Sequence, residues 1–300
     1  MLYGILVATG ASDRSADPAR RAAMLAAAHS SNSSGKLELL SVATARAPGQ
    51  PAWWQARNRL MHQAARLRKA FGVRCTALLG AGSLAAEVMA RIEATEPGLV
   101  VLGWHAPSWL GRLRKAWTLA RIVQRSRRPV LVVRNAALRP YARVLAASDF
   151  ADDELHVARA ALRCAPGAHL TLLHALDTGI DGTMRRVGVT DAAIEQHRRE
   201  RRRTAQAAFE GFVEKLGLPA QRVSLVLTLH PQRAGLRLHA EFARPDLIVL
   251  GEGGLLSCLP GMSAVRELLA DTACDVLVVP PPAQDAATGL ARRRGRPLTA

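Results

Sequence analysis

Short apolar runs alternate with longer amphipathic stretches along this chain. The apolar runs are four to six residues long and rich in Val, Leu and Ile, which is typical of strands buried on both faces of a parallel sheet. The stretches between them show helical spacing of their apolar residues. In residues 83–93, for example, one helix face would carry Leu84, Val88, Met89 and Ile92. Strands that alternate with helices predict right-handed βαβ crossovers and a doubly wound parallel sheet.

The predicted elements occur twice in the same order. The matching runs are 4–15 and 143–154, 36–42 and 169–175, 97–106 and 245–254, and 128–133 and 274–279. The second member of each pair follows the first by 133 to 148 residues, as in a duplication with loop insertions. The sequence therefore predicts two α/β domains, residues 1–138 and 139–280. The tail, 281–300, is basic and has the composition of a disordered segment.

The composition agrees with two globular domains. The chain has 300 residues, of which 49% are hydrophobic, so each half can bury a core. We find no apolar run of 18 residues, and the first residues are typical of a strand and not of a signal peptide, so we expect a cytoplasmic protein without a membrane span. The cysteines lack the spacing of metal ligands, and we expect reduced, mostly buried thiols at Cys75, Cys164, Cys258 and Cys274.

The positive charge is confined largely to the first half. The net charge is +17, of which residues 1–138 contribute +14, residues 139–280 zero and the tail +3. All five tryptophans also lie in the first half. This asymmetry favours an anionic partner for the first half, although it gives no information about the fold.

Ligands of doubly wound sheets bind at the carboxyl ends of strands, where the strand order reverses. In the second half, Asp149 follows the first apolar run, and Gly251 and Gly254 follow the run that begins at residue 245. In these positions the second half resembles the universal stress protein family. The resemblance implies that Asp149 contacts a nucleotide base and that the glycines begin a Gly-x2-Gly-x9-Gly-Ser/Thr loop around ribose and phosphates. Glycine lets backbone N–H groups approach phosphate, and a helix N-terminus favours an anion.

The glycine loop departs from the family pattern after its first two glycines. Nine residues past Gly254 the sequence reads Ala-Val and not Gly-Ser. A loop two residues shorter would bring Ser263 to the hydroxyl position, with Gly261 nearby. The resemblance thus implies an ATP or other adenine-nucleotide site, without a metal, formed by Asp149, Gly251, Gly254, Gly261 and Ser263. The alternative is that Gly251 and Gly254 only make a tight strand-to-helix turn.

The first half resembles the same family in outline only. Gly10 stands where the aspartate is expected, and the glycine motif reads Gly103, Ala106, Ala116 and Trp117. Methyl groups at two of these positions would crowd the phosphates, and the indole of Trp117 would fill their space. We therefore expect that the first half has lost nucleotide binding of the family type.

The resemblance covers about residues 2–280, and the arrangement is similar to the two-domain stress proteins of bacteria. It implies Rossmann-like domains of the adenine nucleotide alpha hydrolase type. Family members commonly dimerise through the last strand of a domain. In a tandem chain this predicts that residues 130–133 and 276–279 pair the two halves about a pseudo-two-fold axis, and further homodimerisation stays open.

The resemblance implies a non-catalytic stress-response or regulatory protein. The sequence contains no HExxH, no GxSxG elbow with an acid and a histidine in order, and no Walker A motif, so no enzyme class is indicated. Asp149 would orient a base, which is a binding role. Slow ATP hydrolysis at the same site is a further alternative.

A polyanion-binding protein is the main alternative function. Residues 103–129 combine three tryptophans with basic residues, a pattern that can hold nucleic acid or an anionic membrane surface. The tail sequence Arg-Gly-Arg-Pro at 294–297 resembles a minor-groove motif, although four residues match by chance easily. The competing interpretation is that the tryptophans pack into the vacated nucleotide pocket or a domain interface.

Two patterns mimic functional motifs and are interpreted as structural. Residues 80–85 fit a dinucleotide-binding fingerprint, but they lie outside the first βα unit, so we expect a loop before an amphipathic helix. The charged run at 197–203 should open a long helix that continues to about Gly217, with its charges solvated.

Overall fold

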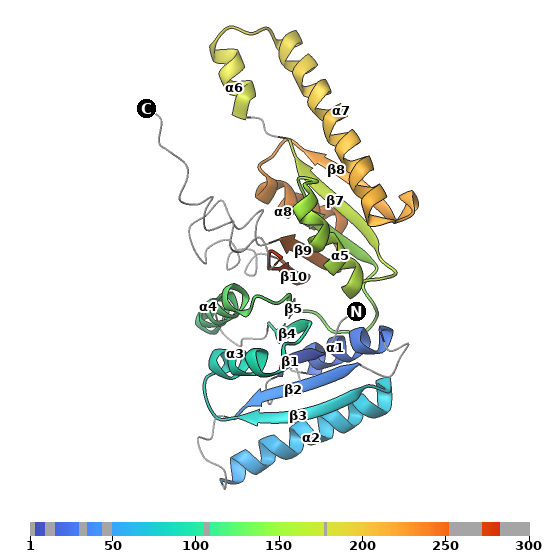
Figure 1. The fold of residues 1–300 in the computed structure, drawn as a ribbon. Helices are drawn as coiled ribbons and strands as arrows, with labels where there is room; N and C mark the ends of the chain where they lie inside the picture. Colours follow the sequence, from blue (N-terminus) through green and yellow to red (C-terminus); the bar gives the residue numbers. More distant parts are fainter. Residues whose placement is uncertain are drawn as a thin grey trace.

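The computed structural model describes residues 4–9, 16–29, 35–43, 50–104, 109–176, 179–251 and 272–282. Within these ranges, ten strands form one sheet in the order β3-β2-β1-β4-β5-β10-β9-β6-β7-β8. Figure 1 shows the first half at the bottom and the second half at the top, joined where β5 lies beside β10. Each half contributes a parallel five-stranded unit, so the predicted doubly wound α/β architecture is confirmed.

The elements alternate between strand and helix in both halves. In the first half the strands are β1 Ile5–Thr9, β2 Lys36–Val42, β3 Arg74–Gly80, β4 Leu99–Gly103 and β5 Val130–Val133, and the helices are α1 Ala16–Ala28, α2 Pro51–Phe71, α3 Leu84–Thr95 and α4 Trp109–Ser126. In the second half the strands are β6 Arg143–Ala147, β7 His169–Ala175, β8 Val223–Thr228, β9 Leu247–Gly251 and β10 Asp275–Val279. Its helices are α5 Leu155–Cys164, α6 Gly179–Arg186, α7 Asp191–Leu216 and α8 Gln232–Ala243, with 3₁₀ turns at Asp152–Glu154 and Ala220–Arg222.

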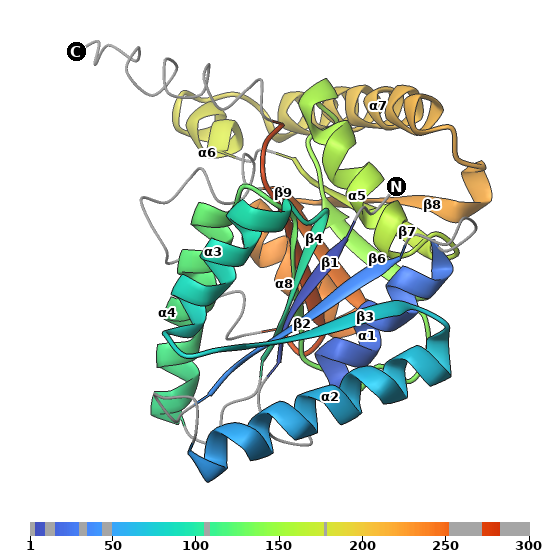
Figure 2. The same cartoon turned by 60° about the horizontal axis from the view of Figure 1, so that its bottom comes forward.

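Both faces of the sheet are covered, as the unbroken apolar runs predict. One core lies between the sheet and α1, α2, α5 and α7, and the other lies between the sheet and α3, α4 and α8 (Figure 2). Strand β1 illustrates how the residues are shared, because Ile5 and Val7 face the first core and Leu6 faces the second. None of the helices in the described ranges is long and apolar enough to cross a membrane.

The two halves are joined by an antiparallel pair of strands, which we call the seam. Strand β5 pairs with β10, with Val132 opposite Val276, Leu131 opposite Leu277 and Val130 opposite Val278. These are the strands that the sequence predicts, and the antiparallel pairing of equivalent strands gives the expected pseudo-two-fold arrangement. The prediction that the halves pair with each other is therefore confirmed.

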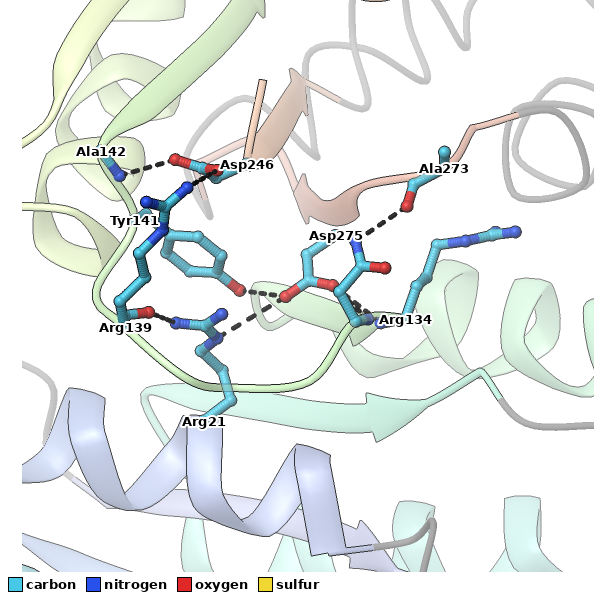
Figure 3. Close-up of polar contacts among 9 residues, drawn as sticks. Arg21, Arg134, Arg139, Tyr141, Ala142, Asp246, Ala273 and Asp275 are labelled. Atoms are coloured by element: carbon cyan, nitrogen blue, oxygen red, sulfur yellow. Dashed lines mark hydrogen bonds and ion pairs between the residues drawn. The ribbon is translucent and has the colours of Figure 1, made fainter. Parts of the chain in front are cut away.

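A buried carboxylate holds the segment that connects the two halves. Asp275, at the start of β10, accepts hydrogen bonds from the backbone N–H groups of Arg134 (2.8 Å) and Asn135 (3.1 Å) and from the Tyr141 hydroxyl (2.6 Å). The guanidinium of Arg21 on α1 lies 3.6 Å from the same carboxylate and 4.0 Å from the Tyr141 ring centre. Figure 3 shows these side chains converging from α1, the connecting segment and β10. The halves are thus linked by a buried polar cluster as well as by the seam.

The surroundings of Tyr141 keep it a neutral hydrogen-bond donor. Burial, and then the negative charge of Asp275, raise the pKa of the Tyr141 phenol well above its usual value. A second carboxylate, Asp246 before β9, accepts hydrogen bonds from the backbone N–H groups of Ala142 (2.9 Å; Figure 3) and Arg143 (3.0 Å). The connecting segment is therefore held at both ends by aspartates of the second half.

The glycine pattern at 80–85 is a structural turn, as expected. The Glu87 side chain accepts a hydrogen bond from the Gly82 backbone N–H (3.0 Å), and a Cβ at Gly80 would lie 2.6 Å from that side chain. Ser83 caps α3 through the N–H of Ala86. A carboxylate of the protein itself thus occupies the place where a dinucleotide fingerprint would receive phosphate.

The long charged helix begins earlier than the sequence predicts. Thr190 accepts a hydrogen bond from the Ala193 N–H and starts α7 at Asp191, six residues before the predicted start at His197. Gly217, at φ +67°, ends the helix where expected. The helix α6, which was not predicted, packs against α7, and the Asp181 carboxylate binds Arg198 at 2.9 Å.

The described cysteines are buried free thiols, in agreement with the prediction. Burial raises the pKa of Cys75 to about 11 and the pKa values of Cys164 and Cys274 to about 12. A thiol with a raised pKa is a weak nucleophile, so these side chains serve packing. Cys258 lies outside the described residues.

Candidate functional site

The strand order of the second half reverses between β6 and β9. These strands are neighbours, with Ala146 opposite Val249, and each is followed in sequence by a connection to a strand on its far side. Asp149 lies two residues beyond the end of β6, and Gly251 is the last residue of β9. Two of the predicted site residues therefore meet at one edge of the sheet, where ligands of such folds bind. The other three, Gly254, Gly261 and Ser263, lie outside the described residues.

The turn after β6 is fixed by a residue in an unusual backbone conformation. Phe150 has φ +64°, in the left-handed region that rarely suits a residue with a side chain. Its buried ring stacks on His174 at 5.0 Å and meets Phe212 edge-on at 5.8 Å. This packing offsets the backbone cost and leaves the neighbouring Asp149 side chain exposed, with its Oδ1 accepting the Ala151 N–H at 3.0 Å.

A partly buried carboxyl group lies directly behind Asp149. Glu154 Oε2 accepts hydrogen bonds from the Ser148 hydroxyl (2.6 Å) and from the Asp149 backbone N–H (2.8 Å). The Nδ1–H of His174 donates to the Ser148 carbonyl at 2.9 Å, so β7 also supports this turn. Sequence reasoning did not identify Glu154, although an acid shortly after a strand-ending Ser-Asp pair is a readable signal.

Glu154 titrates near neutral pH because of its position. Burial, opposed by the Ser148 hydrogen bond and assisted by the charge of Asp149, raises the pKa of its carboxyl group to about 7. Asp149 therefore presents its carboxylate to solvent beside a second carboxyl group that holds a proton over part of the physiological range.

The titration of Glu154 predicts a pH dependence of stability. The pKa in the folded chain, about 7, lies above the ordinary value of 4.5, so the folded state holds this proton more tightly than the unfolded state. The contribution of this group to the free energy of unfolding is fully present below about pH 4.5. It is lost as the pH rises from there through 7, by up to about 3 kcal/mol. Urea unfolding of Glu154→Gln from pH 5 to 8 should show a flatter profile than the parent. Parallel profiles would show that Glu154 does not titrate in this window.

The equivalent edge of the first half is built differently. Trp104 follows Gly103 of β4, its N–H donates to the Val133 carbonyl (2.8 Å), and its ring lies 4.7 Å from the Arg134 guanidinium. The partly buried side chain of Trp104 packs against the core, and its placement in a vacated nucleotide pocket or a domain interface stays a prediction. Ala116 is buried in α4, whereas Trp117 is 44% exposed. The prediction that the Trp117 indole fills the space of the phosphates stays a prediction. Gly10 and Ala106 lie outside the described residues.

One measurable hollow lies away from the predicted site. It has a volume of about 380 Å³ and is bordered by the C-terminal end of α8 and by residues that precede β9 and β10, among them Arg244 and Cys274. These residues are at the amino ends of the strands, opposite Asp149 and Gly251. Within the described ranges, no group of three or more His, Cys, Asp or Glu side chains could hold a metal ion.

Solved structures share this architecture over almost the whole chain. A universal stress protein from Archaeoglobus fulgidus DSM 4304 superposes with a TM-score of 0.64 at 15% identity, covering 93% of this chain and 99% of its own. A functionally unknown protein from Pseudomonas aeruginosa PAO1 superposes with a TM-score of 0.61 at 20% identity, covering 97% and 98%. These likenesses show the fold. The search of curated proteins found no match.

The family follows from the sequence match together with the fold. Residues 1–134 and residues 140–280 each match the model of the universal stress protein family. The two matches lie side by side along the chain, one in each half of the ten-stranded sheet. This protein belongs to the universal stress protein family and carries two of its domains in tandem.

Proposed function

We propose that this protein is a non-catalytic regulatory member of its family, which acts in stress responses by binding an adenine nucleotide in its second half. The observation that supports this most directly is the juxtaposition of Asp149 and Gly251 at the carboxyl ends of two neighbouring strands, at the point where the strand order reverses.

The exposed Asp149 side chain suits a nucleotide base, because its carboxylate can accept hydrogen bonds from the amino group of adenine. At Gly251 the close approach is made by α5, since a Cβ there would lie 2.9 Å from Cγ2 of Val157. In the proposal, Gly254, Gly261 and Ser263 supply the amide and hydroxyl groups that contact ribose and phosphate. ATP or another adenine nucleotide would bind without a resident metal.

Calorimetric titration with ATP, ADP and AMP tests the site. Asp149→Ala removes hydrogen bonds to a charged acceptor, worth about 1.5–3 kcal/mol, so affinity should fall roughly 10- to 100-fold. Gly254→Val should also weaken binding, because it places a branched side chain in the glycine loop. The matched control is Asp152→Ala, which removes the same charge at a position three residues from Asp149. The Asp152 side chain is 78% exposed and forms an ion pair with Lys215.

The titration has two outcomes that contradict the proposal. If the parent protein binds none of the three nucleotides, the site does not exist. If Asp149→Ala binds as the parent does, or if Asp152→Ala is equally weakened, the ligand lies elsewhere. ATP turnover that Asp149→Ala abolishes would show that the site is catalytic and would replace the binding role with hydrolysis.

A second candidate function is the binding of polyanions by the first half. It is supported by the separation of charge, since residues 1–138 carry a net charge of +14 whereas residues 139–280 carry none. No Asp or Glu occurs between Glu38 and Glu87, or between Glu96 and Asp149. The first half therefore carries an attractive field for anions that the second half lacks.

A further inference from the structure

Helix α2 carries exposed basic side chains around the part of its surface that does not face the core. Its inner face packs on the core through Leu60, Ala64 and Leu67. The outer surface, which we call the α2 cationic face, consists of exposed side chains from α2 together with one from the neighbouring α1: Arg57, Arg59, Arg66, Arg68, Lys69 and Arg20. The helix itself contains no Asp or Glu.

These cations lack carboxylate partners within the described part of the chain. Their recorded contacts are with aromatic rings and a backbone carbonyl: Arg57 lies 5.5 Å from the Trp54 ring, Arg20 lies 6.0 Å from the Phe71 ring, and Arg68 Nε donates to the Ala64 carbonyl. Unpaired cations on a surface repel one another, and an external anion relieves that repulsion.

Helix α7, which is also rich in basic residues, shows a different arrangement. On α7, Arg198 binds the Asp181 carboxylate at 2.9 Å, and Glu195 lies within 4.0 Å of Arg199 and Arg202. Basic residues of α7 therefore have carboxylates within reach on α6 and α7, whereas α2 contains no carboxylate. The contrast indicates that the α2 cationic face is not simply another solvated charged helix.

The α2 cationic face lies on a single helix on the outer side of the first half. At 3.6 residues per turn, Arg57 and Arg68 lie on one flank of α2 and Arg59 and Arg66 lie on the other. Figure 1 shows α2 at the opposite end of the molecule from the second half. A helix rises 1.5 Å per residue, so residues 57–69 span about 18 Å. A single strand with one phosphate per ~3.4 Å carries about five phosphates over that length, close to the six cations of the face.

Trp54 offers a flat apolar surface beside the charges. Its indole is 48% exposed and is braced by Trp53, whose ring lies 5.2 Å away at 88°. Exposed indoles among cations suit the stacking of unpaired bases. The only other large apolar side chain exposed on the described part of α2 is Met61, so the surface offers little area for insertion into lipid.

We propose that the α2 cationic face binds the phosphates of single-stranded nucleic acid without sequence preference, with Trp54 stacking on a base. This inference rests on the second candidate function and names the surface that would carry it. Because α2 and the Asp149 edge belong to different halves, nucleic acid and adenine nucleotide would bind at separate places.

Fluorescence anisotropy with a labelled 20-nucleotide oligothymidine tests the proposal. Affinity should fall steeply with salt between 50 and 200 mM KCl, with a log–log slope of about −4 if all six cations engage phosphates. A triple variant, Arg57→Gln, Arg66→Gln and Lys69→Gln, should bring the slope to about −2 and weaken binding at least about tenfold at 50 mM KCl. The matched control, with Arg199→Gln, Arg202→Gln and Arg203→Gln on α7, removes the same charge and should change affinity less than about threefold.

The possible results distinguish a failure of polyanion binding from a wrong assignment of the binding surface to α2. If the parent does not bind the oligonucleotide at 50 mM KCl, polyanion binding itself is overturned. If the parent binds but the α2 and α7 triple variants are weakened equally, the function stands and the α2 surface is overturned. Tighter binding to phosphatidylserine vesicles than to the oligonucleotide would overturn the proposal in favour of a membrane surface.

The variant Trp54→Ala tests the stacking role. It should lower affinity for the single strand about tenfold and change affinity for a 20-base-pair duplex little, and an equal loss of affinity for both would overturn the stacking role.

Discussion

Replacing Asp275 with alanine is expected to lower the free energy of unfolding by about 3–5 kcal/mol, because it leaves a buried guanidinium without its counter-charge. Arg21 and Asp275 are both almost fully buried, at 5% and 1% exposure. The substitution also removes the acceptor for the Tyr141 hydroxyl and for the backbone N–H groups of Arg134 and Asn135. Each buried donor left without an acceptor adds to the cost. Urea unfolding at pH 7, followed by circular dichroism, measures the change.

The same variant should reduce the cooperativity between the two halves. Asp275 joins α1, the connecting segment and β10, so its loss removes polar contacts that couple the halves and leaves the seam. We expect the single unfolding transition of the parent to separate into two. Asp152→Ala is the control, since its exposed ion pair with Lys215 contributes less than about 1 kcal/mol. A change within 1 kcal/mol of the parent for Asp275→Ala would refute the structural role assigned to the cluster.

Phe150→Ala is expected to cost about 3–4 kcal/mol, because it empties the space that a buried ring occupies between His174 and two phenylalanines of α7. Phe150→Gly should be less destabilising than Phe150→Ala by about 1 kcal/mol. Both variants lose the ring, but only glycine adopts φ +64° without a steric cost. Thermal and urea unfolding of the two variants side by side give the comparison.

At Phe150 glycine is expected to be better tolerated than alanine, and the control for this order is Phe209. The Phe209 ring meets Phe150 edge-on from the interior of α7. At a helical position glycine is worse than alanine by about 1 kcal/mol, so Phe209→Gly should be less stable than Phe209→Ala. If glycine is the more destabilising residue at both positions, the left-handed conformation at Phe150 does not carry the cost assigned to it. A loss of nucleotide affinity in Phe150→Ala would further show that this turn positions Asp149.

Much of the fold could be predicted because it follows from local pattern. The apolar runs identify the strands, and their repetition identifies the duplication. The seam at 130–133 and 276–279 was predicted from the family resemblance, which implies pairing through the last strand of each domain. The meeting of Asp149 with Gly251 was also predictable, because the topology of such sheets brings these strand ends together.

Contacts between residues far apart in the chain could not be predicted from the pattern of apolar and polar positions. Arg21 and Asp275 lie far apart in the sequence, and nothing in either neighbourhood marks the contact. Glu154 acquires its raised pKa from burial and from Asp149, which depends on the shape of the turn. The exposed fraction of Trp117, 44%, could not be predicted, because the position of a helix over a sheet, and not its sequence, decides which side chains reach the strand ends.

The seam has a consequence for how the protein responds to dilution. A dimer held by edge strands dissociates as its concentration falls, and its subunits exchange with those of other dimers. Here both edge strands, β5 and β10, belong to one chain, so their pairing has no dissociation constant and persists at any concentration. Covalent linkage also fixes the stoichiometry at one basic first half to each second half. The two domains can therefore evolve to bind different ligands, and each first half still pairs with a second half and not with another first half.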